Sequence, residues 1–174
     1  MTHQLITPLK HLQDLLGMSR RVASDEDLKA LLDTAARAIS ETLGFGSVVI
    51  NVYRPAWDDL VAAAVESDHP GAREQLLGST LHIDDLAPIL DERHLYHGAY
   101  MARVSAEELA GVTSFVPPIP TAEDWETWGP DDWLCVPMRD VLGSLIGLLS
   151  VDAPPGLRRP ARMRCAYWSA TRVV

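Results

Sequence analysis

The sequence predicts an α+β domain, and three observations support this class. Leucine and alanine recur with helical spacing through much of the first 43 residues. Runs rich in β-branched and small apolar residues follow between positions 47 and 65, and such runs are typical of strands. Near the C-terminus, two apolar runs between Asp132 and Asp152 flank a short turn, which predicts a β-hairpin in the core.

The composition is that of one globular domain and excludes two classes of partner. The chain has 174 residues, of which 47% are hydrophobic and 22% charged, so it can bury a core without disulfides or metals. The net charge is −9 and the pI is near 5.0. Nucleic-acid binding and docking on anionic membranes both need basic surfaces, so we expect neither partner.

Cysteine content and hydropathy indicate a cytoplasmic protein. Cys135 and Cys165 form no CxxC pair and no disulfide framework, so a reducing compartment is expected. The first residues lack the cationic start and apolar run of a signal peptide. The longest apolar run, Leu145 to Val151, is too short to cross a bilayer.

The N-terminal leucines predict a helix with a narrow apolar seam. Leu5, Leu9, Leu12 and Leu16 are spaced by four, three and four residues, and the helix begins near Pro8. This seam either packs on its own domain or holds two chains together as a homodimer. Two heptads are too few to decide between these alternatives.

The next elements have clear boundaries. Ser24 can cap a helix over 25–43, and Gly44 is suited to end it. Residues 47–53 predict a strand, and 60–65 predict its partner in a meander.

Shorter elements follow, and then the periodicity weakens. We expect a short helix at 72–77, a short strand at 80–83 and another short helix at 84–90. Residues 112–116 predict a strand that the following prolines end. The whole stretch 91–130 is otherwise irregular, and long irregular segments in compact domains are usually functional.

Aromatic residues in and beside this irregular stretch are the candidate ligand-binding residues. Aromatic side chains with polar tips can line a small-molecule pocket, although a packed core beneath a long loop would look the same in sequence. The candidates are Tyr96, His97, Tyr100, Phe115, Trp125, Trp128 and Trp133.

No metal site and no catalytic site is predicted. His82, His94 and His97 lack the partners of a recognisable metal motif. Cys135 lies between Leu134 and Val136, which offer no cation or base to lower its pKa, so it is expected to be a buried core residue.

The acidic residues near the hairpin are not predicted to be catalytic. Asp131 and Asp132 precede a strand and Asp140 lies in the turn, which are positions where carboxylates are usually solvated. Asp152 ends the second run. No phosphate-binding loop or nucleophile elbow is present in the sequence.

The hairpin and the residues before it resemble the GAF family of ligand-sensing domains. The family segment has the form LxVPxRDxxGxxIGxLSVDxP. Here it begins with Leu134-Cys135-Val136-Pro137-Met138-Arg139-Asp140, continues through Gly143 and Ile146-Gly147, and ends with Ser150-Val151-Asp152 and Pro154. The resemblance covers about residues 24–160, and the order of helices and strands agrees with it.

The resemblance implies a central antiparallel sheet of about five to six strands. N-terminal helices would pack on one face, and loops and short helices would cover the other, with a ligand pocket beneath them. Known ligands of the family include cyclic nucleotides, haem, bilins and small metabolites, so the cofactor is unknown. The implied role is a sensory or regulatory module in bacterial signal transduction.

Two further functions are open, and the tail departs from the family. The chain could be a ligand-free interaction module, or a thiol-dependent enzyme that reduces free methionine sulfoxide through Cys135 and Cys165. We divide the chain into a possible dimerisation helix (1–23), the GAF-like domain (24–160) and an atypical tail (161–174). The tail is a poor output helix, which indicates action in trans or a truncation or frameshift near Pro160.

Overall fold

The computed structural model describes residues 25–96, 98–105, 107–109 and 111–160. The predicted N-terminal seam, the homodimer that depends on it and the tail 161–174 therefore lie outside the described residues and stay predictions. Among the described residues, no helix is long and apolar enough to cross a membrane.

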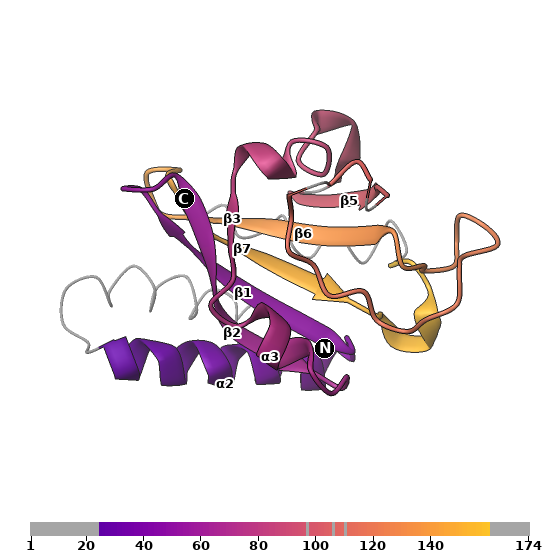
Figure 1. Cartoon of the computed structure of the whole chain (residues 1–174), viewed down its shortest axis with the longest axis horizontal. Helices are drawn as coiled ribbons and strands as arrows, with labels where there is room; N and C mark the ends of the chain where they lie inside the picture. The colour runs from indigo at the N-terminus through magenta and orange to yellow at the C-terminus, as the bar shows by residue number, and fades with distance from the viewer. Residues whose placement is uncertain (1–24, 97, 106, 110, 161–174) are drawn as a thin grey trace.

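One antiparallel sheet of seven strands organises the domain (Figure 1). Its strand order is β3-β2-β1-β7-β6-β5-β4, so the hairpin β6–β7 lies in the centre. This confirms the α+β class and the antiparallel sheet, with one or two strands more than predicted. The strands are β1 (Ser47–Arg54), β2 (Asp59–Ser67), β3 (Thr80–His82), β4 (Leu95–Tyr96), β5 (Ala99–Arg103), β6 (Asp132–Arg139) and β7 (Leu145–Asp152).

Helix α2 (Asp25–Leu43) covers one face of the sheet (Figure 1). Its bounds agree with the predicted helix. Leu32, Ala36 and Ile39 point inward from three successive turns and pack with Val48 and Ile50 of β1, and all five are buried. This is the ordinary arrangement of an amphipathic helix on a sheet.

Short elements and loops cover the opposite face. Their apolar residues form a second core, in which Leu86 and Ile89 pack with Leu60, Cys135 and Leu148 of the sheet. The short elements are α3 (Ala72–Leu76) and the single 3-10 turns η1 (Asp84–Leu86), η2 (Glu92–His94) and η3 (Pro155–Leu157).

Two predicted elements are wrong in detail. The helix expected at 84–90 is only the turn η1 followed by further turns, and Pro88 within it cannot donate a helical hydrogen bond. The strand expected at 112–116 is irregular. Two prolines follow it directly, and a strand needs a ladder partner that this segment lacks among the described residues.

Gly147 lets strand β1 approach the centre of the sheet closely. A side chain at this position would collide with the carbonyl oxygen of Asn51 in β1 and with the Cε of Met138 in β6. Gly147 therefore permits a close approach of the neighbouring backbone, as a glycine inside a strand often does.

We expect Gly147→Ala to lower the free energy of unfolding by about 1–3 kcal/mol, because the added methyl group must displace β1 or Met138. Urea denaturation measures this change. Ser144→Ala is the control, since the Ser144 side chain is exposed in the same hairpin. Equal stability of the two variants would contradict the close approach.

Candidate ligand cavity

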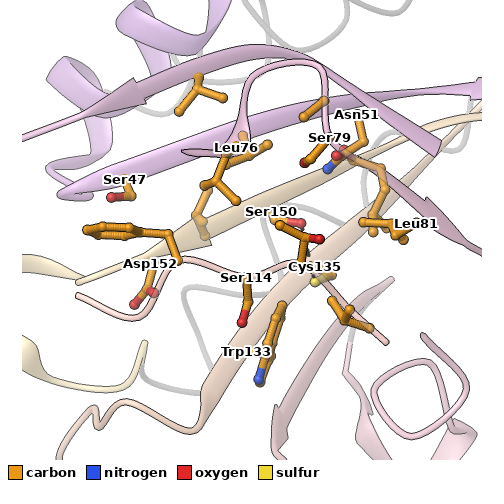
Figure 2. A pocket seen from close by; sticks show the side chains of 18 of the residues that line it. Ser47, Asn51, Leu76, Ser79, Leu81, Ser114, Trp133, Cys135, Ser150 and Asp152 are labelled. Atoms are coloured by element: carbon orange, nitrogen blue, oxygen red, sulfur yellow. Dashed lines mark hydrogen bonds between the residues drawn. The ribbon is translucent and has the colours of Figure 1, made fainter. Parts of the chain in front are cut away.

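A cavity of about 90 Å³ lies between the sheet and the segments that cover it (Figure 2). It has room for several water molecules. Side chains from the central strands form its floor, among them Val49 and Asn51 of β1 and Leu148, Ser150 and Asp152 of β7. The position agrees with the pocket that the family resemblance implies.

Strand alternation and register bring the floor residues together. Every second residue of a strand faces the same side, so Leu148, Ser150 and Asp152 share one face of β7. The register places Ser47 opposite Asp152, and both Val49 and Cys135 opposite Ser150. Three strands thus present a mixed apolar and polar surface to the cavity.

The roof is the irregular segment 112–116 together with α3. Two side-chain contacts connect this segment to the region after β2. Gln75 Nε2 donates to the backbone oxygen of Ser114 at 3.0 Å, and the rings of His69 and Phe115 lie 5.9 Å apart between centroids. The roof is therefore held by side chains and not by a strand ladder.

The predicted aromatic residues lie in different places. Phe115 and Trp133 line the cavity. Trp128 is fully buried in the core beneath α2, but its Nε1 donates to Asp152 Oδ1 at 2.7 Å. It therefore touches a lining residue without lining the cavity itself.

The other candidates are not among the lining residues. Trp125 is 62% exposed, and the guanidinium carbon of Arg159 lies 3.7 Å from its ring centroid. Tyr100 packs against the second core and Tyr96 lies at the end of the edge strand β4. His97 is outside the described residues. The assignment of all seven to ligand binding stays a prediction.

Local sequence gives no signal that the polar residues Ser47, Asn51 and Ser150 belong to one floor. Alternation within the predicted strands places Val49 and Asn51 on the same face of their strand, and Ser150 and Asp152 on the same face of theirs. Only the register of β1 against β7 shows that the two sets share a surface.

Asp132 is buried in an ionic cluster beside the cavity, which corrects the prediction that it is solvated. Its side chain is fully buried and pairs with Arg103 and Arg159. Gly129 N also donates to it at 2.8 Å. Burial opposes ionisation, but the hydrogen bonds from the two arginines outweigh it, so the pKa of Asp132 lies below its usual value.

Asp152 shows the opposite balance. Burial raises the pKa of its carboxyl group, and hydrogen bonds from Trp128 Nε1 and Ala153 N offset this only in part. The negative charge of Asp132 raises the pKa further. A carboxyl group whose pKa is shifted by burial and by a neighbouring charge, and which lines a cavity, is a candidate functional group.

Cys135 is a buried thiol on the cavity floor. Its Sγ lies 3.6 Å from Ser150 Oγ, and burial raises the pKa of the thiol to about 11. Cys165 lies outside the described residues. Within the described part of the chain, no group of three or more His, Cys, Asp or Glu side chains is arranged to hold a metal ion.

The sequence matches the GAF domain family over residues 27–166. The chain belongs to the GAF family. This family consists of small-molecule-binding sensory modules, and the cavity of this GAF domain lies on the face opposite α2. Comparison with curated proteins gives no significant match.

Solved structures resemble this chain at low sequence identity. The type II free methionine-R-sulfoxide reductase from Thermoplasma acidophilum is 15% identical, with a TM-score of 0.50, covering 86% of this chain and 89% of that one. The GAF domain of an Acinetobacter phosphoenolpyruvate-protein phosphotransferase is 14% identical, with a TM-score of 0.45 and coverages of 93% and 90%. The second GAF domain of DevS from Mycobacterium smegmatis is 15% identical, with a TM-score of 0.48 and coverages of 80% and 83%. The likeness to the reductase, whose TM-score is 0.50, shows a common fold alone.

We expect Asp132→Asn to lower the free energy of unfolding by about 3–5 kcal/mol at pH 7, because it leaves buried Arg159 without its counter-charge. The pKa of Asp132 is lowered by folding, so its contribution is present above the ordinary carboxyl pKa and is lost as the pH falls. The difference from wild type should therefore narrow below about pH 4 in urea denaturation. A constant difference down to pH 2 would contradict the ionic role.

Asp152→Asn should have the opposite effect and raise the free energy of unfolding at pH 7. The amide keeps an acceptor for Trp128 Nε1 and removes a charge that burial disfavours. Folding raises the pKa of Asp152, so the advantage should disappear as the pH falls below the ordinary carboxyl pKa. Glu123→Gln, at an exposed position, controls for the change in net charge. Destabilisation at pH 7 would contradict this assignment.

Proposed function

We propose that this GAF domain is a sensory module that binds a small molecule in the cavity and regulates a partner or an attached domain. The cavity itself carries the proposal. Its wall is mainly apolar with a few polar groups, which is the usual form of a small-molecule site.

The construction of the roof supports a sensory role. The floor belongs to a seven-stranded sheet, whereas segment 112–116 has no regular structure and is held by contacts from Gln75 and His69. A ligand that touches both would favour conformations in which the roof is closed over it. Differential affinity for such a conformation is what allows a ligand to shift a population.

A chain of hydrogen bonds connects the cavity wall to the last described residues. Asp152 accepts from the Trp128 side chain, and Trp128 N donates to Leu157 O at 2.8 Å. Arg159 N then donates to Glu126 O at 2.8 Å. A change at Asp152 can thus reach Leu157 and Arg159, and we assign the output of the sensor to this last described segment.

The burial and the raised pKa of the Cys135 thiol support ligand binding as the function in preference to redox catalysis. Cys135 has a pKa of about 11 and is buried, so almost none of it is thiolate at neutral pH. A nucleophilic cysteine needs the opposite environment, with a lowered pKa and access to solvent.

A thermal-shift screen tests the proposal. We expect at least one compound in a panel of metabolites, cyclic nucleotides and haem to raise the Tm, since a ligand at 100 times its Kd adds about 2.7 kcal/mol of stability. Val49→Phe should abolish the shift, because the larger ring fills the cavity floor.

Val141→Phe is the matched control for this experiment. The same change is made in the exposed hairpin turn, where Val141 is 77% exposed, and the shift should be retained. A shift that survives Val49→Phe, or a complete panel without any shift, would contradict binding in this cavity.

A further inference from the structure

The charge of the cavity wall restricts what the cavity can bind. The described residues that line it include two aspartates, Asp132 and Asp152, and no lysine, arginine or histidine. A phosphate or carboxylate in this space would therefore meet carboxylates without a cation on the wall to balance its charge.

Three of the polar residues on the wall already have hydrogen-bond partners. The Ser47 hydroxyl is bonded to that of Ser67 at 2.7 Å, and Asn51 Nδ2 donates to Leu148 O at 3.3 Å. Asp132 uses both carboxylate oxygens in its bonds to Arg103, Arg159 and Gly129. None of these groups leaves an unbalanced charge facing the cavity.

Asp152 is the exception among the described lining residues. Its Oδ1 accepts from Trp128 Nε1 and Ala153 N, and both of these donors are neutral. No described residue donates a hydrogen bond to its Oδ2. The carboxylate therefore lacks a cationic partner and has one oxygen available to a ligand.

We propose that the cavity binds a small organic ammonium ion with an apolar body, whose cationic group pairs with the Asp152 carboxylate. This inference rests on the proposed function and specifies the ligand class. The body of the ligand would contact the apolar floor, which includes Val49 and Leu148, and the rings of Phe115 and Trp133. Aromatic faces also attract an ammonium group directly.

The proposal explains why an acid is placed at this position. Without a ligand, burial penalises the charge of Asp152, and an ammonium ion supplies the missing counter-charge. Because Trp128 bonds to the same carboxylate, the ligand would act on the residue that connects the cavity to Leu157.

Three probes of similar shape test the ligand class: benzylammonium, benzyl alcohol and benzoate, titrated by ligand-observed NMR. We expect wild type to bind benzylammonium about tenfold or more tightly than benzyl alcohol, as for other charge-assisted hydrogen bonds. Benzoate should bind most weakly. Asp152→Asn should remove the preference for the cation and leave the affinity for benzyl alcohol within about threefold.

The pH dependence gives a second readout. The preference for benzylammonium over benzyl alcohol should fall as the pH is lowered and Asp152 becomes protonated. In Asp152→Asn, the relative affinity of the two probes should not change with pH. Asp132 and His69 are the titratable groups that act on Asp152. A His69→Gln variant removes the basic side chain that acts on Asp152, and its preference for benzylammonium should still depend on pH.

The outcomes separate this inference from the proposed function. Benzoate binding as tightly as benzylammonium, a preference that persists in Asp152→Asn, or no binding of any probe at millimolar concentration would overturn the ammonium class. The proposed function would still stand if the metabolite panel yields a ligand that Val49→Phe excludes. Glu123→Gln is the control for net charge and should bind all three probes as wild type does.

Discussion

The buried carboxylate of Asp132 is the constraint on which the rest of the site depends. It joins β6 to β5 through Arg103 and to the C-terminal segment through Arg159. Arg103 also donates to the backbone oxygens of Asp124 and Thr127, which positions the loop that contains Trp128. The ion cluster thus adds buried ionic contacts where backbone hydrogen bonds already join β5 to β6 and residues 126–128 to 157–159.

The two faces of the sheet differ in composition and in role. The face beneath α2 is a continuous apolar core that includes Trp128 and gives the domain its stability. The opposite face has a smaller core, and polar side chains interrupt it where the cavity lies. The contrast between Asp132 and Asp152 follows this division. Asp132 pairs with two arginines, whereas Asp152 accepts hydrogen bonds from neutral donors at the edge of the cavity.

Local sequence signals predicted the elements that depend on local chemistry. The bounds of α2 agree with those predicted from the sequence signals at Ser24 and Gly44, and the central hairpin agrees with the prediction from its two apolar runs and its turn. Asp140 and Gly143 close that turn: Asp140 accepts from the backbone of Ser144, and Gly143 has a positive φ. These signals are contained within a few neighbouring residues.

The elements that were missed depend on partners far away in the chain. Strand β5, with the sequence AYMAR, has no β-branched residue and is a strand because β6 offers it an edge. The burial of Asp132 depends on arginines 29 residues before it and 27 after it. The aromatic prediction included Phe115 and Trp133 of the cavity wall, but the floor required the register of β1 against β7.

The most direct measurement is a ¹H–¹⁵N NMR titration of the protein with benzylammonium. The indole N–H of Trp128 and the amides of Ser114 and Phe115 should shift together along one binding curve, because Ser114 and Phe115 line the cavity and Trp128 donates to the lining residue Asp152. The amides of the exposed turn at Val141 and Leu142 should not move. Shifts confined to that turn, or no shift at Trp128 while other residues respond, would contradict a ligand cavity that is read out through Asp152.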